Sequence, residues 1–172
     1  MTYLLFLIAS FCLAYFLLRF IFSSFFEQTS ARLNARSVFF SLSGIVCSIL
    51  IVYIVSYAIP NAEIGNRILH IFGGGFLSFL LCFLVVKDSG LRIGRFRFFV
   101  FSFFVTVTLG VANEIAEFFL QHYLAFDFAR TITDTWLDLL SNVVGAVIAG
   151  VCFVPFITPA RKKHTLFGRI RV

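Results

Sequence analysis

Long apolar runs alternate with short polar breaks along the whole chain. About 20 consecutive apolar residues suffice for a helix to cross the hydrocarbon core of a bilayer, and the chain contains five runs of about this length. They are Tyr3–Phe22, Val38–Ile59, Ile68–Val86, Phe98–Leu120 and Trp136–Ile157. The pattern predicts an all-α fold, a polytopic transmembrane bundle of five spans that forms a single domain.

The composition agrees with this pattern and excludes other classes of protein. Of the 172 residues, 60% are hydrophobic and 13% are charged, whereas soluble domains carry about 25% charged residues. A chain this apolar cannot stay solvated without structure, so intrinsic disorder is excluded. The four cysteines lie inside apolar runs without C-x-x-C spacing, which argues against a disulfide scaffold.

The basic residues predict the orientation of the spans. Twelve of the 14 Lys and Arg residues lie in or beside the first break, the third break and the basic tail over residues 158–172, while only Arg67 and Arg130 lie in the other two breaks. Because Lys and Arg collect in cytoplasmic loops, we expect the N-terminus outside and the C-terminus in the cytoplasm. The net charge is +6, and the basic residues that carry it flank the predicted helices. This placement predicts contact with anionic lipid rather than with nucleic acid.

The polar residues inside the spans gather on the predicted outer side, and the opposite halves of the spans contain no acidic residue. They recur at intervals of three and four residues, which places them on one face of a helix. The stripe on the fourth span is Thr106, Gly110, Asn113, Glu114, Glu117 and Gln121. The stripe on the fifth is Asp134, Asp138, Ser141, Asn142, Gly145 and Ala149, whose small residues suit close helix packing. With His70 on the third span, the stripes predict an outward-open polar pocket.

Glu114 and Glu117 are neighbours on the fourth span. Two carboxyl groups this close together in an apolar medium do not both stay ionised without a cation. A proton, an arginine (Arg67 or Arg130) or a divalent ion would each solve the problem. Imidazole and carboxylate groups suit zinc or manganese, and the candidate ligands are His70, Glu114, Glu117 and Asp138. Purely structural hydrogen bonds or salt bridges between spans are the competing interpretation.

Several of these residues fall in a recognisable order. Asn66-Arg67-Ile68-Leu69-His70 is followed by Glu114-Ile115-Ala116-Glu117, then Arg130, then Asp138-Leu139-Leu140-Ser141-Asn142-Val143-Val144-Gly145-Ala146. Over about residues 60–150 the chain resembles the VanZ-like family of small bacterial membrane proteins and its YjdF-type relatives. Asn66 stands where that family has aspartate, and Glu117 stands where it has glutamine.

The resemblance implies a multi-pass protein of the bacterial cytoplasmic membrane with a role in the cell envelope, because the founding member is associated with low-level teicoplanin resistance. Our main hypothesis is an outward-facing pocket that binds an envelope lipid or a lipid-linked head group. Arg67 and Arg130 would hold anionic oxygens of this ligand. The other binding residues would be His70, Glu114, Glu117, Asp134, Asp138 and Asn142.

Two other functions stay open. The first is a metal-dependent hydrolase or transferase acting on a lipid, with His70, Glu114, Glu117 and Asp138 as candidate catalytic residues and Glu117 as the base. The second is a proton- or cation-coupled transporter, which is disfavoured because the carboxylates occupy one leaflet and five spans do not divide into two equal repeats. A homo-oligomer could supply the missing half.

Overall fold

The computed structural model describes residues 2–27, 34–124 and 132–158. Within these ranges the chain is helical apart from short turns, and five helical segments are long and apolar enough to cross a membrane. These spans are Leu4–Phe25, Ala35–Ala58, Ala62–Asp88, Arg95–Tyr123 and Ile132–Phe156. The prediction of an all-α bundle of five spans is therefore confirmed.

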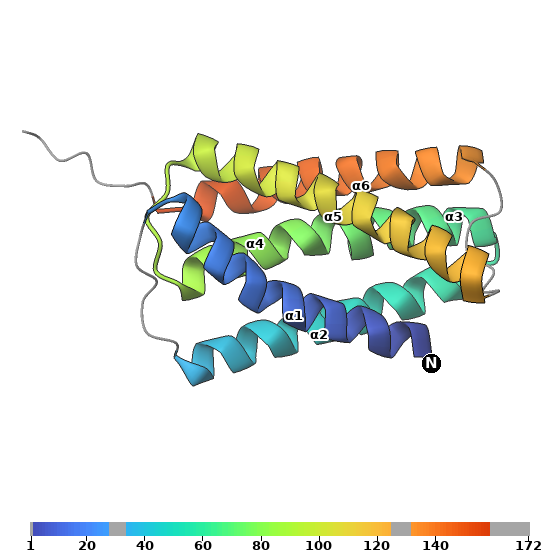
Figure 1. Cartoon of the computed structure of the whole chain (residues 1–172), viewed down its shortest axis with the longest axis horizontal. Coiled ribbons are helices and arrows are strands. Elements are labelled where there is room, and N and C mark those ends of the chain that lie inside the picture. Colours follow the sequence, from blue (N-terminus) through green and yellow to red (C-terminus); the bar gives the residue numbers. More distant parts are fainter. Residues whose placement is uncertain (1, 28–33, 125–131, 159–172) are drawn as a thin grey trace, which may run out of the picture.

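Three of the spans contain a single long α-helix: α1 (Thr2–Phe25), α2 (Ala35–Ala58) and α5 (Arg95–Leu124). The third span is built from α3 (Ala62–Ile68), a π-helix η1 (Leu69–Phe76) and α4 (Leu77–Asp88), which follow one another without a break. The fifth span consists of α6 (Ile132–Phe153) and the short 3-10 helix η2 (Val154–Phe156). Consecutive spans run in opposite directions, as Figure 1 shows.

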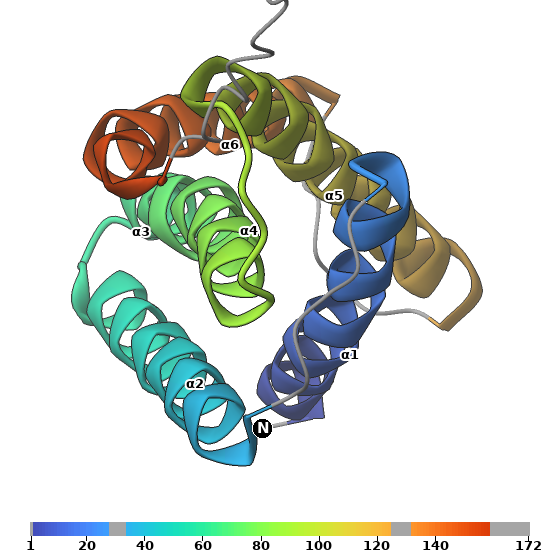
Figure 2. The ribbon, with the colours of Figure 1, turned by 90° about the vertical axis from the view of Figure 1, so that its left-hand side faces the viewer.

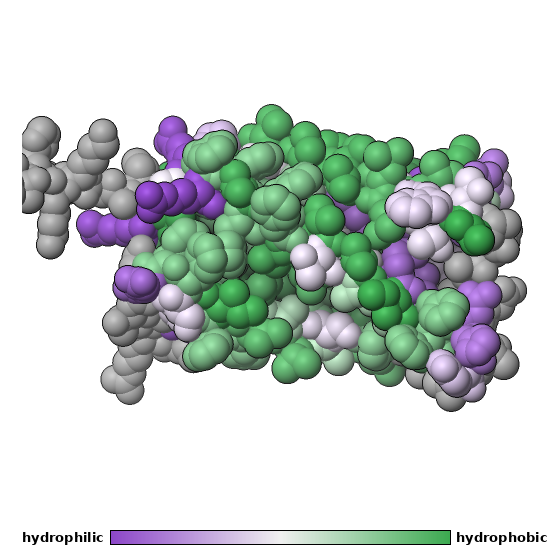
Figure 3. Space-filling view, turned by 45° about the horizontal axis from the view of Figure 1, so that its top comes forward, coloured by the Kyte–Doolittle hydropathy of each residue, from purple (hydrophilic) through white to green (hydrophobic). Residues whose placement is uncertain are grey.

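The third span forms the centre of the bundle. It packs against α1, α2, α5 and α6, and in Figure 2 these helices surround it. In the most apolar stretch of 18 residues in this span, 56% of the residues are buried, compared with 11% in the corresponding stretches of the first and second spans. The outer spans therefore present most of their side chains to lipid, and Figure 3 shows an apolar belt with polar residues gathered at the two ends.

Glycines let the third span and α6 approach unusually closely. A Cβ added at Gly145 would lie 1.9 Å from the carbonyl oxygen of Ile71, and one added at Gly75 would lie 2.1 Å from that of Asn142. Both distances are far below a van der Waals contact, so only glycine fits. The close packing expected from the small residues on the fifth span is thus present, and it joins the two helices that carry most of the polar site.

The beginning of the third span differs from the prediction. The sequence pattern placed Arg67 in a polar break, but the helix already begins at Ala62. Asn61 caps it, because its side-chain oxygen accepts hydrogen bonds from the backbone N–H groups of Glu63 (3.0 Å) and Ile64 (3.1 Å). Arg67 consequently lies on the same rigid helix as the residues that follow it.

Asp88 lies in the polar break that was predicted after the third span, but α4 extends to it. It is the last residue of α4, at the end of the bundle opposite His70. Its carboxylate accepts hydrogen bonds from the hydroxyls of Tyr15 (2.5 Å), Ser37 (2.6 Å) and Ser41 (2.7 Å). The carboxylate therefore ties α1 and α2 to the central span.

Candidate functional site

Polar side chains from the third span, α5 and α6 meet inside one end of the bundle, where α1 begins. We call this set the polar cluster. It consists of Asn66, Arg67, His70, Asn113, Glu114, Glu117, Asp134, Asp138 and Asn142. The positions that sequence analysis assigned to one stripe on the fifth span, from Asp138 to Ala149, are indeed buried in the bundle.

The central span brings three of these residues to one face. Asn66 and Arg67 lie on α3, and His70 follows at the start of the π-helix η1. Glycine favours helices weakly, and the run Gly73-Gly74-Gly75 lies within this π-helix. π-helical turns are rare and are frequent at functional sites. No pattern in the sequence distinguishes this π-helical turn from an ordinary α-helix.

Arg67 forms a double ion pair with α6. One terminal nitrogen pairs with the carboxylate of Asp134 and the other with that of Asp138. The guanidinium also donates a hydrogen bond to the backbone oxygen of Asp134 (3.2 Å), and the side-chain amide of Asn66 donates to Asp138 (3.0 Å). Because these two aspartates stand one turn apart, a planar guanidinium can contact both. Arg67 thus pairs with the α6 aspartates and not with the glutamates of α5.

His70 lies between two carboxylates. Its Nε2 is 3.4 Å from Asp138 Oδ1, and its Nδ1 is 3.8 Å from Glu114 Oε1. All three residues are buried, with exposed fractions of 8% for His70, 8% for Glu114 and 3% for Asp138. One donor atom from each can be chosen so that all lie within 4.8 Å of one another. The three spans therefore bring together the residue types that bind a transition-metal ion.

Glu117 lies beside this group without joining it. It is buried, and its carboxylate accepts a hydrogen bond from the side-chain amide of Asn113 on the same helix (2.8 Å). The expected four-residue set is thus reduced to His70, Glu114 and Asp138. Arg130, the other cation that we expected at the site, lies outside the described residues.

Two buried oxygens of the cluster have no hydrogen-bond partner among the described residues. They are Oε1 of Glu114 and Oδ1 of Asn142. Buried polar groups are nearly always hydrogen-bonded, and an unpartnered one costs about 1–3 kcal/mol. Such atoms are suited to contact a bound group.

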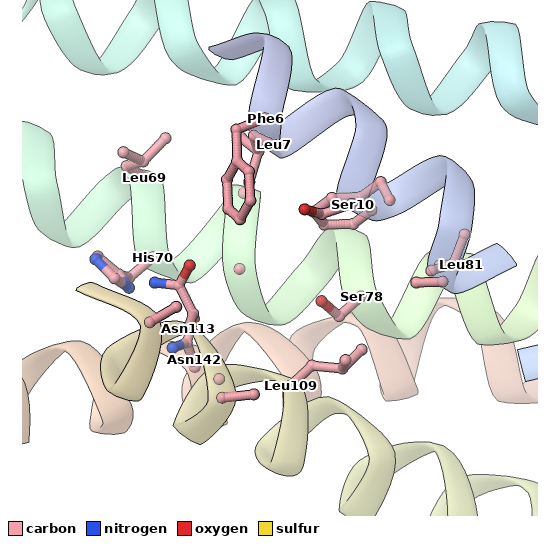
Figure 4. Close-up of a pocket in the computed structure, with 17 residues that line it drawn as sticks. Phe6, Leu7, Ser10, Leu69, His70, Ser78, Leu81, Leu109, Asn113 and Asn142 are labelled. Carbon is pink, nitrogen blue, oxygen red and sulfur yellow. The ribbon is translucent and has the colours of Figure 1, made fainter. Parts of the chain in front are cut away.

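A pocket of about 240 Å³ opens beside the cluster, between α1 and α5 and over η1 and α4. Figure 4 shows His70, Asn113 and Asn142 at one end of it. Along the remaining length its walls are mostly apolar side chains and glycines. These residues are Phe6, Leu7, Phe11, Ala14, Leu69, Gly73, Gly74, Leu81, Leu109, Gly110, Ala112 and Ala116, with Ser10 and Ser78 as the polar exceptions.

The contacts of α1 explain why the pocket lies only at this end. Near the opposite end α1 meets α5 through aromatic rings, with centroid distances of 4.8 Å for Phe22 and Phe101 and 4.4 Å for Phe25 and Phe101. Toward its beginning α1 contributes Phe6 and Leu7 to the pocket wall instead. These wall residues could not be recognised in the sequence, because an apolar residue that faces a pocket looks the same there as one that faces lipid.

The fold and the site define an integral membrane protein of five helical spans with a polar cluster buried at one end. The chain belongs to a family described as predicted membrane proteins (DUF2238), which matches residues 1–158. No curated protein and no solved structure matches the chain. The family match extends beyond the region that resembles VanZ-like proteins and establishes membership of a membrane-protein family.

Proposed function

We propose that this protein binds an amphiphilic envelope lipid, or a lipid-linked head group, in the pocket beside the polar cluster. The observation that carries the proposal is the amphiphilic lining of that pocket. Its polar end is formed by His70, Asn113 and Asn142, and its body is apolar. A molecule that satisfies both parts needs a polar head and a hydrocarbon segment.

The size of the pocket fits part of a lipid. A cavity of about 150 Å³ holds one benzene ring, so about 240 Å³ accommodates a head group or a short length of chain. A whole lipid is much larger. The rest of the ligand would therefore stay in the bilayer, which favours a ligand that enters from the membrane over a small soluble metabolite.

The charges on the two ends of the bundle support an outward-facing pocket. Among the described residues, the end opposite the polar cluster carries Lys87, Arg92, Arg95 and Arg97. At the cluster end Arg67 is ion-paired with Asp134 and Asp138. Lys and Arg mark the cytoplasmic side, so we place the N-terminus and the pocket on the outer side of a bacterial cytoplasmic membrane.

Arg67 can contact a ligand while it keeps its ion pairs with Asp134 and Asp138. A guanidinium has five N–H donors in a fixed plane, and the side chain is 18% exposed. In the proposal it contributes to binding anionic oxygens, as does Arg130. The remaining residues of the cluster select the head group by hydrogen bonding and charge. With the resemblance to VanZ-like proteins, this supports an influence on envelope composition and on teicoplanin susceptibility.

The proposal is tested by lipid retention in native mass spectrometry. The probes are phosphatidylglycerol and a polyprenyl phosphate, added to purified protein in detergent. Ala116→Trp fills the pocket from α5, whereas Ile115→Trp adds the same ring at a neighbouring position that is 51% exposed. We expect retention of at least one probe to fall at least fivefold in Ala116→Trp and to be unchanged in Ile115→Trp. Equal retention by both variants would refute the pocket as the binding site.

A cellular experiment addresses the envelope role. The wild-type protein is expressed in a teicoplanin-sensitive bacterium, and the minimum inhibitory concentration is compared with that of cells expressing Ala116→Trp at the same level. The proposal predicts higher teicoplanin tolerance with the wild type alone. Unchanged susceptibility in both strains would contradict the link to glycopeptides.

A further inference from the structure

His70, Glu114 and Asp138 form a compact donor set at the boundary between the polar cluster and the pocket. They come from η1, α5 and α6, so the folded bundle alone brings them together. We infer that these three residues bind a divalent transition-metal ion of the Zn²⁺ type. The binding of the ion is independent of the proposed function, whereas the use of the ion to hold a head group rests on it.

The spacing of the donors is close to that of a zinc site. At metal–ligand distances of about 2.0–2.2 Å, two ligands on a tetrahedral ion lie about 3.4 Å apart. The nearest nitrogen–oxygen distances are 3.4 Å from His70 Nε2 to Asp138 Oδ1 and 3.8 Å from His70 Nδ1 to Glu114 Oε1, and a set with one donor atom from each residue spans 4.8 Å. Side-chain rotations that draw the donors of this set together by up to about 1.4 Å complete the geometry.

His70 has a carboxylate at each ring nitrogen, Asp138 at Nε2 and Glu114 at Nδ1. Only one of the two nitrogens can bind an ion that both carboxylates share. A rotation of the ring or of one carboxylate side chain would therefore bring the third donor to the ion.

The unpartnered oxygen of Glu114 points to a missing positive partner. Oε1 is fully buried, has no hydrogen-bond partner among the described residues, and lies 3.8 Å from His70 Nδ1. Burial of an ionised carboxylate is very costly unless a cation or a hydrogen-bond donor compensates it. An ion beside His70 would compensate this oxygen directly.

The charges of the donor set lead to the same ion. Glu114 and Asp138 place two buried carboxylates beside His70, and a divalent cation would offset both charges. Arg67 contacts Oδ1 of Asp138, the oxygen nearest His70 Nε2, so the ion would share this carboxylate with Arg67.

The position of the ion would connect it with the pocket. His70 lines the pocket, while Glu114 and Asp138 are buried beside His70 and are not among the lining residues. A site with three protein ligands keeps a further coordination position open. In this site the open position can take an anionic oxygen of a head group, such as a phosphate oxygen, which would explain how so acidic a cluster holds an anionic ligand.

Zinc binding to the full-length protein tests the inference without any lipid ligand. Protein purified in detergent is stripped with a chelator, and Zn²⁺ is titrated against a chromophoric competitor, with Mg²⁺ as the comparison ion. We expect one tight equivalent of Zn²⁺ per chain and at least 100-fold weaker Mg²⁺ binding. The absence of a stoichiometric Zn²⁺ site in the wild type overturns the inference.

Matched variants locate the site. His70→Gln, Glu114→Gln and Asp138→Asn should each weaken Zn²⁺ binding at least tenfold. The controls are His122→Gln and Glu63→Gln, which remove the same residue types from exposed positions and should bind Zn²⁺ like the wild type. If the three site variants retain wild-type affinity, the inference is wrong.

A second readout does not depend on the folding of variants. Co²⁺ bound to the wild-type protein should give visible absorption bands of a four- or five-coordinate nitrogen and oxygen site, displaced by one equivalent of Zn²⁺. A spectrum of octahedral aqueous Co²⁺ overturns the inference. Zn²⁺ binding without lipid retention would refute only the proposed function, and lipid retention without Zn²⁺ binding would refute only the metal site.

Discussion

Substitution of Gly145 by alanine tests whether the close contact between α6 and the third span assembles the site. The added Cβ would lie 1.9 Å from the carbonyl oxygen of Ile71, whereas a carbon and an oxygen in contact lie about 3.3 Å apart. The two backbones must therefore separate by about 1.4 Å. Ile71 directly follows His70, so the separation would also move His70 away from Asp138.

The expected magnitude comes from a comparison with Gly44→Ala. A Cβ added at Gly44 on α2 meets no atom within 4 Å, so this variant only gains the helix propensity of alanine, about 1 kcal/mol. Gly145→Ala has the same gain in stability from helix propensity, but the added methyl group overpacks the contact with Ile71, which lowers the stability by about 1–3 kcal/mol. We expect Gly145→Ala to be less stable than Gly44→Ala by this amount.

The assay is thermal unfolding of both variants, followed by size-exclusion chromatography with fluorescence detection. For a chain of this length 1 kcal/mol corresponds to about 2–4 °C, so a difference of about 1–3 kcal/mol should separate the two unfolding midpoints by about 2–12 °C. The affinity for Zn²⁺ should fall at least tenfold in Gly145→Ala alone. Equal midpoints and equal affinities would show that the contact does not hold the site together.

Three further predictions concern the ion pairs, the opposite end of the bundle and the orientation. Arg67→Ala leaves the carboxylate of Asp138 buried without its partner and should cost about 3–5 kcal/mol of stability. A midpoint within 2 °C of the wild type would contradict this. Asp88→Asn should cost about 1–3 kcal/mol, because an amide accepts fewer of the hydroxyl hydrogen bonds made there. If Asp88→Asn unfolded at the same temperature as the wild type, this end of the bundle would be held by apolar packing. In a background without native cysteines, a membrane-impermeant maleimide added to whole cells should label Glu63→Cys and not Phe96→Cys. The reverse pattern would refute the outward-facing pocket.

The five spans could be predicted because the thickness of a bilayer sets a minimum apolar length, and each span exceeds it. The stripes on the fourth and fifth spans could be predicted for a similar reason. Buried positions on one helix recur every three or four residues, so Asp138 and Asn142 had to share a face. His70 was expected near Glu114 and Asp138 because the three residues were placed at a similar depth in the membrane.

The pairing of Arg67 could not be predicted. The predicted depth of Arg67 in the membrane placed it near both the glutamates of α5 and the aspartates of α6. The choice depends on the rotation of α3, which begins at Ala62 under the cap of Asn61. The sequence pattern located that boundary several residues too late, so it did not show that Arg67 shares a helix and its register with His70.

The pocket walls and the role of Asp88 were hidden for different reasons. Apolar residues such as Phe6 and Leu109 carry no sign of whether they face lipid or a pocket, since both surroundings are apolar. Asp88 stands beside Lys87 at the end of a span and has the composition of a solvated loop. Its hydrogen bonds to Tyr15 and Ser41 depend on the positions of α1 and α2, which local sequence does not encode.

In the proposed function, the pocket beside His70 holds the head end of an amphiphile. The most direct measurement is an electron cryomicroscopy structure of the protein in nanodiscs made from bacterial lipid, with a rigid binding protein attached to add mass. We expect elongated density between α1 and α5 whose polar end lies beside His70 and Asn142. A map in which the side chains of α1 and α5 meet across this space, with no density between them, would contradict it.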